Sequence, residues 1–359
     1  MKIKEGKIEI FQDKEVFYNP LAELNRDLSV SALQVFQKQT KLKLNILDAL
    51  AATGVRGIRY AKEVKGIKEM VLNDKNPRAV KLIKRNVKLN KAGTCKTERK
   101  DANILLREKI FNVIDLDPFG SPNVFLDSAA KSIWHKGFLM VTATDTAPLC
   151  GTYPEACLKK YGIESIKTDF YNELGIRILI THIMQNVFRY ERAFVPVFVL
   201  ADKHYFRVFG KIEHFGKASN ILDEFGYVMY SECGNREFGE IKEKCGICNK
   251  KFKICGKIYL GPIIDRKFVS EMIKDLEKRK FRQGKEELKI LNTAKNEINV
   301  PFYYDIHDLA SILKIKELPK LDEIIKKLRS KGFKASRTSL DYTGIKTDIS
   351  FKRFKNLLL

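Results

Sequence analysis

The residues best suited to chemistry are Asp117, Pro118, Phe119 and Gly120, which follow the apolar run 111–116. An exocyclic amine on a flat base can donate to the Asp117 carboxylate and to the backbone carbonyl beside Pro118, whose ring fixes the local dihedral. Phe119 can stack on the base. Acceptors on both amine hydrogens turn the nitrogen lone pair outward, toward an electrophile such as a methyl group on a sulfonium. The four residues therefore predict a clamp for an amino group.

The same four residues also form an ordinary turn signal, because Asp-Pro-x-Gly favours a tight loop by itself. The motif alone does not separate a turn from an amine clamp. The clamp interpretation requires a methyl donor site and a means of holding a base elsewhere in the chain.

A second motif, from 48 to 57, follows the predicted strand 44–47 and opens a helix. Gly54 lets the backbone approach a ligand closely, but the G-x-G-x-x-G spacing of a dinucleotide site is absent. The carboxylate of Asp48 followed by one tight glycine turn suits the amino acid end of S-adenosylmethionine. Arg56 either meets the carboxylate of that donor or pairs structurally with Asp48.

Two more acidic residues follow the next strands. Asp74 follows the predicted strand 69–73, where one carboxylate matches the vicinal hydroxyls of a ribose. Asp101 and Ala102 follow the strand 96–99, where they would meet the adenine amine. Each acid alone is equally consistent with a helix N-cap. Three acids and a glycine turn at the carboxyl ends of three strands predict one convergent donor site.

Short apolar strands alternate with amphipathic helices over the first two hundred residues, which is typical of a parallel sheet with helical crossovers. Only 201–204 separate the last two strands, so we expect a hairpin with an antiparallel final strand. This is the architecture of class I S-adenosylmethionine-dependent methyltransferases, a Rossmann-like α/β fold. The predicted strands are 44–47, 69–73, 96–99, 111–116, 137–142, 195–200 and 205–210.

At 359 residues the chain is long enough for two domains. We expect a catalytic domain over 1–211 and a smaller, basic α+β domain over 212–359 that binds a nucleic acid. One long charged helix is expected over 265–284. Residues 303–359 predict two helices and then a hairpin around the turn 341–344, an arrangement that resembles a winged helix.

The charge balance points to a polyanionic partner, since 67 Lys and Arg face 44 Asp and Glu and the net charge is +23. Proteins from hot environments are also rich in lysine, but they usually gain acidic residues in parallel. A nucleic acid is favoured over a membrane surface. In the winged-helix-like region, phosphate contact is favoured over a merely solvated face. Its basic residues are Lys326, Lys327, Arg329, Lys331, Lys334 and Arg337.

The amino terminus is charged and has no apolar segment of the signal-peptide kind, and the longest apolar run, 194–200, is too short to span a bilayer. We therefore expect a soluble, cytoplasmic protein with no membrane partner. The oligomeric state is left open, and a monomer is compatible with the sequence.

The seven cysteines are an odd number, which indicates reduced thiols rather than a disulfide framework. Cys245 and Cys248 form a C-x-x-C pair, with Cys255 and Cys233 nearby, and four thiolates can bind Zn²⁺. The second pair of a zinc ribbon is missing because position 258 is isoleucine. The alternative is a group of reduced cysteines that only pack.

Together these motifs resemble the tRNA guanine-26 N2-dimethyltransferases, over nearly the whole chain. The resemblance implies transfer of two methyl groups from S-adenosylmethionine to the exocyclic amine of one guanine, at the junction between two arms of a tRNA partner. The matching stretches are 17–20, 23–29, 48–59, 73–74, 101–102, 115–122, 144–156 and 344–348.

The resemblance also implies roles for individual residues. Phe17 and Arg26 enter through it alone; by themselves they are equally a core aromatic ring and a surface arginine near Asp27. Family members often carry two cysteine pairs, from which this chain departs. The implied donor contacts are Arg26, Arg56, Asp74, Asp101 and Ala102, with Asp117 holding the amine and Phe17 and Phe119 forming the pocket walls.

Two other functions fit parts of the sequence. An adenine N6-methyltransferase acting on DNA or RNA would use the same clamp, because such a motif serves any exocyclic amine. A non-catalytic RNA-binding protein on a methyltransferase fold would show damaged donor residues, whereas this chain keeps Asp48, Gly54, Asp74 and Asp101.

Overall fold

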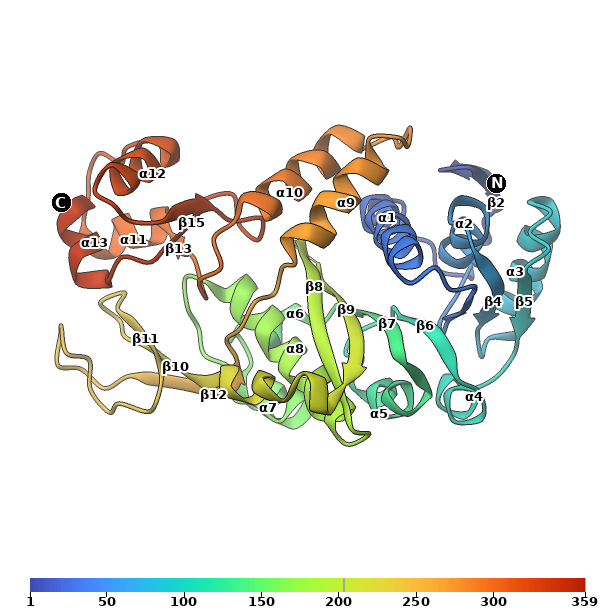
Figure 1. Cartoon of the computed structure of the whole chain (residues 1–359), viewed down its shortest axis with the longest axis horizontal. Coiled ribbons are helices and arrows are strands. Elements are labelled where there is room, and N and C mark those ends of the chain that lie inside the picture. Colours follow the sequence, from blue (N-terminus) through green and yellow to red (C-terminus); the bar gives the residue numbers. More distant parts are fainter. Residues whose placement is uncertain (203, 359) are drawn as a thin grey trace.

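The largest sheet contains β3 (Leu44–Asp48), β4 (Ile67–Asn73), β5 (Cys95–Glu98), β6 (Phe111–Leu116), β7 (Ile133–Ala143), β8 (Arg192–Asp202) and β9 (Tyr205–His214). The computed structural model describes residues 1–202 and 204–358. The strand order is β5-β4-β3-β6-β7-β9-β8, and β9 is antiparallel to both of its neighbours (Figure 1). The predicted strands and their closing hairpin are therefore confirmed, with ends that shift by a few residues.

Helices connect the strands and cover both faces of the sheet (Figure 1). Because successive strand residues point to opposite faces, Val113 packs into one hydrophobic core and Ile114 into the other. The parallel arrangement brings the carboxyl ends of β3, β4 and β6 to the same edge. The connecting helices are α2 (Val55–Glu63), α3 (Pro77–Leu89), α4 (Ala102–Glu108), α5 (Asn123–Ser132), α6 (Thr146–Leu149), α7 (Pro154–Tyr161) and α8 (Tyr171–Phe188).

The prediction of one long helix over 265–284 is wrong. The chain forms α9 (Arg266–Leu276), which Asp265 caps by accepting from the backbone N–H of Lys267, and then α10 (Gly284–Asn296). The break lets α10 fold back on α9, and Leu291 and Ala294 join the same core as Phe268 and Met272.

Helix α9 also packs against α1 (Glu23–Thr40), which precedes the sheet in the chain. Ser31 on α1 donates a hydrogen bond to the Met272 carbonyl oxygen at 3.1 Å, and Lys38 pairs with Asp275 at 3.0 Å. The hydrophobic core of the catalytic sheet therefore extends beyond residue 211. The division of the chain at that residue stays a prediction.

The carboxyl-terminal third holds two small antiparallel sheets. The first has the order β11-β10-β12, from β10 (Phe225–Tyr230), β11 (Arg236–Gly239) and β12 (Lys253–Tyr259). The second has the order β13-β15-β14, from β13 (Tyr304–Asp305), β14 (Ala335–Arg337) and β15 (Gly344–Thr347), and packs with α11 (Ile306–Leu313), α12 (Leu321–Ser330) and α13 (Phe351–Leu358). The two predicted helices and the hairpin are present, and α13 adds a helix beyond them.

Buried ion pairs join both small sheets to α8 or to the residues just before it. Lys346 on β15 lies 3.1 Å from Glu173 on α8 and 2.8 Å from Glu297, and all three side chains are buried. Arg236 on β11 donates two hydrogen bonds to Asp169, just before α8, at 2.9 and 2.7 Å. These contacts fix the carboxyl-terminal elements against the catalytic sheet.

A short amino-terminal hairpin, β1 (Lys2–Glu5) and β2 (Ile8–Phe11), packs beside α2 and α3. Short 3-10 helices complete the fold at η1 (Pro20–Ala22), η2 (Phe215–Lys217) and η3 (Ser219–Glu224). Across the described residues, no helix has both the length and the hydrophobicity that crossing a membrane requires.

Candidate active site

Arg56, at the start of α2, is surrounded by acidic and polar side chains from α1 and from the end of β6. One of its terminal nitrogens binds the Asp117 carboxylate beyond the end of β6. The other donates to the Asn25 side-chain oxygen at 3.1 Å and to the Ser29 hydroxyl at 3.2 Å, both on α1. The alternative pairing of Arg56 with Asp48 is not formed, because the Asp48 carboxylate instead accepts the backbone N–H of Gly57 at 3.1 Å.

A buried arginine on β9 stands behind this group. Arg207 donates to both oxygens of Asp115 at 3.0 and 2.8 Å and to the Thr142 hydroxyl at 2.7 Å. Asp115 also accepts the Tyr60 hydroxyl at 2.6 Å and lies 3.7 Å from Arg56. The sequence did not assign Arg207 a role. Its one signal is a charged residue within an apolar strand, since Tyr205, Phe206, Val208 and Phe209 surround it in the chain.

Two arginines set the charge of Asp117. Burial raises the pKa of this carboxyl, but the positive charges of Arg56 and Arg207 and a hydrogen bond from Thr142 outweigh burial and hold the pKa below its usual range. The Asp117 side chain keeps 30% of its surface exposed. It is therefore an ionised acceptor that a ligand can reach.

Asp48 behaves in the opposite way. Burial, and next the nearby charge of Asp115, raise the pKa of Asp48 to about 7 in spite of Arg56. Its side chain is almost wholly enclosed. Asp48 therefore changes its protonation state near pH 7, whereas Asp117 stays ionised there.

The two remaining predicted acids, Asp74 and Asp101, hold the local backbone in shape. One Asp74 oxygen accepts the N–H of Ala52 at 2.9 Å and the other accepts the N–H of Asn76 at 2.8 Å. Asp101 caps α4 by accepting the N–H of Asn103 at 2.8 Å, as the N-cap alternative predicted. Asp101 is exposed and Asp74 partly so, and each carboxylate keeps lone pairs for a ligand. These free lone pairs can accept hydrogen bonds from the hydroxyl groups of a diol and from an amine.

The turn between β3 and α2 has an unusual backbone. Gly54 has a φ of 79°, and Ala52 has a φ of 47°, which side-chain-bearing residues rarely adopt. The contact from Asp74 to the Ala52 N–H holds this conformation. Strained backbone of this kind gathers at ligand sites, so the turn supports a donor site here.

Phe17 and Phe119 lie side by side although they are 102 positions apart in the chain. Their ring centroids are 4.4 Å apart and the ring planes meet at 80°. The side chains are 54% and 73% exposed, so neither is a core residue. Gly120 has a φ of 78°, donates its N–H to the Thr144 hydroxyl at 2.6 Å and accepts the Thr144 N–H at 3.0 Å, so the segment is also a turn. The turn presents Phe119, while Pro118 stays buried beneath it.

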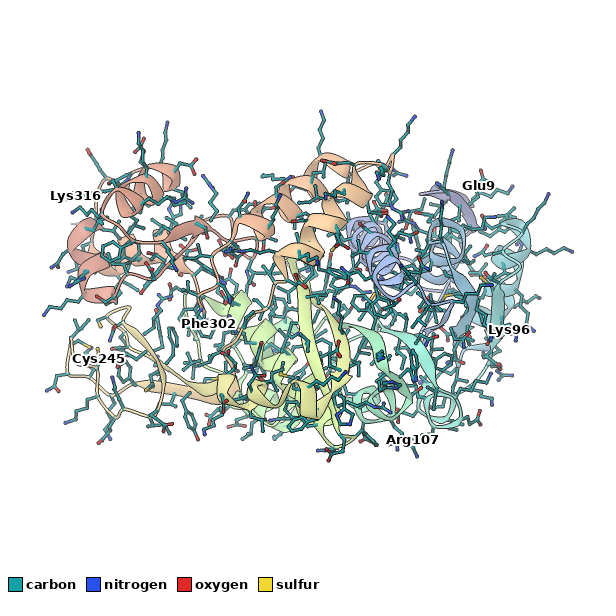
Figure 2. The ribbon with its side chains drawn as sticks, viewed as in Figure 1. Glu9, Lys96, Arg107, Cys245, Phe302 and Lys316 are labelled. Carbon is teal, nitrogen blue, oxygen red and sulfur yellow. The ribbon has the colours of Figure 1, made fainter. Side chains whose placement is uncertain are left out.

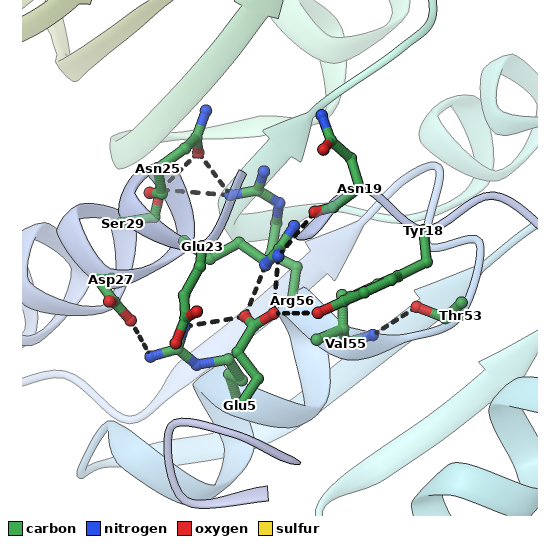
Figure 3. A network of polar contacts seen from close by, with 12 residues as sticks. Glu5, Tyr18, Asn19, Glu23, Asn25, Asp27, Ser29, Thr53, Val55 and Arg56 are labelled. Atoms are coloured by element: carbon green, nitrogen blue, oxygen red, sulfur yellow. Dashed lines mark hydrogen bonds and ion pairs between the residues drawn. The ribbon is translucent and has the colours of Figure 1, made fainter. Parts of the chain in front are cut away.

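Arg26 is buried, not on the surface, and its partner is Glu5 on the amino-terminal hairpin. The guanidinium makes two bonds of 2.6 Å to Glu5 and a third, of 3.0 Å, to the Asn19 carbonyl oxygen. Tyr18 donates to the same carboxylate at 2.9 Å, and Asp27 pairs with Arg59. Figure 3 shows this network, in which Glu5 is the central acceptor. The sequence offered no sign of Glu5, because its partners are far along the chain.

Three of the four predicted zinc ligands come together. The sulfur atoms of Cys233, Cys245 and Cys248 all lie within 4.8 Å of one another. Cys248 lies 3.0 Å from the Ser231 hydroxyl, which lowers the pKa of its thiol to about 7. Figure 2 shows Cys245 at the end of the molecule opposite Lys96 on β5, far from the donor site.

The inclusion of Cys255 in this group is wrong. Cys255 lies on β12 opposite Val228, and both side chains point into the main hydrophobic core. Their neighbours Ile254 and Met229 point the other way, toward the cysteine cluster. Strand alternation therefore removes Cys255 from the site.

Comparison with known proteins places these features in one family. The family described as N2,N2-dimethylguanosine tRNA methyltransferase matches residues 1–358. The tRNA (guanine(26)-N(2))-dimethyltransferase of Methanosphaera stadtmanae is 37% identical over 96% of this chain and 90% of that protein. The enzyme of the same name from Pyrococcus abyssi is 38% identical over 99% of this chain and 96% of that protein.

A solved structure agrees with this match. The complex of Trm1 from Pyrococcus horikoshii with S-adenosyl-L-methionine superposes with a TM-score of 0.90 at 37% identity, over 100% of this chain and 99% of that one. The resemblance seen in the sequence and the predicted methyltransferase fold are thus confirmed. The chain belongs to the N2,N2-dimethylguanosine tRNA methyltransferase family.

Proposed function

We propose that this chain transfers two methyl groups from S-adenosylmethionine to the N2 amine of guanine 26 in tRNA. The observation that carries the proposal is the ionised, reachable Asp117 carboxylate beside the exposed rings of Phe17 and Phe119, at the carboxyl edge of the sheet. Relatives with this activity in their names match nearly the whole chain.

The donor supplies an electrophilic methyl group on a sulfonium. Asp74 would bind the ribose hydroxyls, and Asp101 with Ala102 the adenine, because both carboxylates are accessible and keep spare lone pairs. Asp48 and Gly54 would line the amino acid end. Arg26 and Arg56 are also proposed to contact S-adenosylmethionine. In this structure the guanidinium of Arg26 pairs with Glu5 and that of Arg56 pairs with Asp117.

Asp117 would accept a hydrogen bond from the guanine amine and direct its lone pair. The low pKa makes this carboxylate a weak base, so we expect proton loss to follow bond formation, when the alkylated nitrogen carries a positive charge. Each transfer forms one N–C bond, breaks one C–S bond and releases one proton. The backbone carbonyl at Pro118 and the rings of Phe17 and Phe119 would hold the base in line.

The exposed position of Phe119 bears on the second transfer. After one methylation a single N–H remains for Asp117 to accept, and the first methyl group needs space beside it. Nothing in the described structure covers most of the Phe119 ring, which is 73% exposed. Guanine 26 would enter this open pocket after leaving its stack, at a cost of a few kcal/mol.

The cysteine cluster is proposed to bind Zn²⁺. Cys233, Cys245 and Cys248 supply three sulfur ligands, and the lowered pKa of Cys248 favours the thiolate. The fourth ligand would be a solvent molecule or a group close to Ser231. The distance of the cluster from the donor site argues for a structural role. A cytoplasmic location and a monomeric state stay predictions.

Nucleoside analysis tests the main proposal directly. The protein is incubated with methyl-labelled S-adenosylmethionine and unmodified tRNA transcript, and the digested nucleosides are identified by mass. N2,N2-dimethylguanosine supports the proposal, provided that a transcript with adenine at position 26 stays unlabelled. Labelled N6-methyladenine would instead support the adenine alternative, and unlabelled RNA would support a non-catalytic RNA-binding protein.

A further inference from the structure

Helix α3 carries an unbalanced positive face. Its 13 residues include five basic side chains and no acidic one, and the flanking Lys75 and Lys91 add two more charges. Asn76 caps the helix and Pro77 begins it, while its apolar side is buried against the sheet. The exposed basic residues of the helix are Arg78, Lys81, Lys84, Arg85 and Lys88.

Most of these charges have no partner within the described residues. Arg78 pairs with Glu15, and the Arg85 guanidinium lies 3.5 Å from the centroid of the Phe11 ring. Lys81, Lys84 and Lys88 make no ion pair with any described acidic group. Every other described helix of ten or more residues contains at least one acidic residue. Like charges at helical spacing repel one another, so an external polyanion would relieve α3.

The position of α3 links this face to the proposed pocket. The helix begins three residues after Asp74, at the carboxyl edge of the sheet. Ala79 and Leu82 pack against Val16, the residue before Phe17. The basic face thus starts beside both the proposed ribose contact and one wall of the base pocket. Figure 1 shows α3 at the opposite end of the long axis from α13, the short basic helix of the carboxyl-terminal unit.

We propose that the exposed face of α3 binds the phosphate backbone of tRNA beside the target nucleotide. The proposal rests on the function proposed above, and it adds a contact surface on the catalytic sheet to the basic carboxyl-terminal unit. Phosphate contacts position an RNA without reading its sequence. Holding the backbone on both sides of guanine 26 keeps the nucleotide in register while its base leaves the stack.

A charge-neutral variant of α3 tests the proposal. Lys81→Gln, Lys84→Gln and Lys88→Gln are combined in one protein. The matched control combines Lys68→Gln, Lys131→Gln and Lys136→Gln, three exposed lysines near the amino ends of β4 and β7, at the opposite edge of the sheet. Both variants lose three charges, so a general effect of net charge cancels in the comparison.

The α3 variant is expected to bind tRNA on the order of tenfold or more weakly at 0.1 M salt, and the slope of log affinity against log salt should fall by about 3. Its affinity for S-adenosylmethionine should match that of the wild type, which also shows that it folds. The control should keep the wild-type tRNA affinity and slope. Equal tRNA binding by the two variants overturns the α3 proposal, whereas absence of dimethylguanosine from the wild-type reaction overturns the proposed function.

Discussion

At the scale of single residues, the central feature is that the pKa values of Asp117 and Asp48 shift in opposite directions. Arg56 and Arg207 keep Asp117 ionised, while enclosure and the charge of Asp115 bring the pKa of Asp48 to about 7. The sequence placed Asp48 and Asp117 at strand ends, where chemistry was expected. Arg207 was missed because its bond to Asp115 joins residues 92 positions apart, a separation that no local pattern reveals.

The raised pKa of Asp48 predicts a pH-dependent stability. An unfolded Asp ionises near its usual value of about 3.9, so between there and the folded pKa of about 7 unfolding releases a proton. This group therefore stabilises the fold fully below the unfolded pKa and loses that contribution as pH rises toward 7. Asp48→Asn mimics the neutral acid and should not lose it.

The free energy of unfolding of wild type and Asp48→Asn, measured by denaturant titration from pH 5 to 7, checks this. We expect the variant to gain on the wild type as pH rises, by a slope of up to about 1.4 kcal/mol per pH unit. A pH-independent difference would mean that Asp48 is already ionised in the folded protein.

At the scale of elements, the periodicity of apolar residues predicted the helices and strands that depend on local sequence. Six of the seven strands were predictable because each contains a short apolar run. The polar strand β5 followed from the alternation of β and α segments, which also fixed the parallel crossovers. The break between α9 and α10 was not predictable in this way. Helices α9 and α10 share one core with α1, through contacts between residues that are far apart in the sequence.

The buried cluster of Lys346, Glu173 and Glu297 predicts a large effect from one substitution. Lys346→Met leaves the enclosed Glu297 carboxylate without a cation and Glu173 with Arg177 alone, which should lower the free energy of unfolding by about 3–5 kcal/mol. Arg337→Met removes one partner of an exposed pair with Asp322 and should cost no more than about 1 kcal/mol. Chemical denaturation of both variants measures the contrast, and similar losses would show that the cluster does not hold β15 to α8.

The cysteine cluster predicts which thiols control metal content. On the proposal that the cluster binds Zn²⁺, Cys248→Ser should release the metal from the purified protein, because it removes one of three convergent sulfur atoms. Cys255→Ala should keep its metal, since that side chain points into the core. Elemental analysis of both proteins after gel filtration decides the matter. Metal loss in the Cys255 variant alone would restore the ligand set expected from sequence.

At the scale of the whole molecule, the proposed site lies between two basic surfaces. The donor turn and the amine clamp share the carboxyl edge of the sheet, while basic surfaces lie at both ends of the long axis, on α3 and on the carboxyl-terminal unit (Figure 1). The net charge of +23 predicted a polyanionic partner. The net charge alone did not predict where the partner binds, because only folding decides which charged residues lie together on the surface.

This separation predicts that binding and chemistry can be uncoupled at one residue. Asp117→Ala leaves the donor contacts and both basic surfaces in place, and Asp117→Asn keeps the shape of the side chain without its charge. Both should bind S-adenosylmethionine and tRNA as the wild type does, apart from a modest change where Arg56 loses its partner.

The most direct test is single-turnover methyl transfer to tRNA transcript at saturating enzyme and donor, with the nucleosides identified by mass. We predict that Asp117→Ala lowers the rate of methyl transfer by a factor on the order of 100 or more, with Asp117→Asn between it and the wild type. A wild-type rate in Asp117→Ala, with N2,N2-dimethylguanosine still formed, would contradict the assignment of Asp117 as the residue that holds the amine.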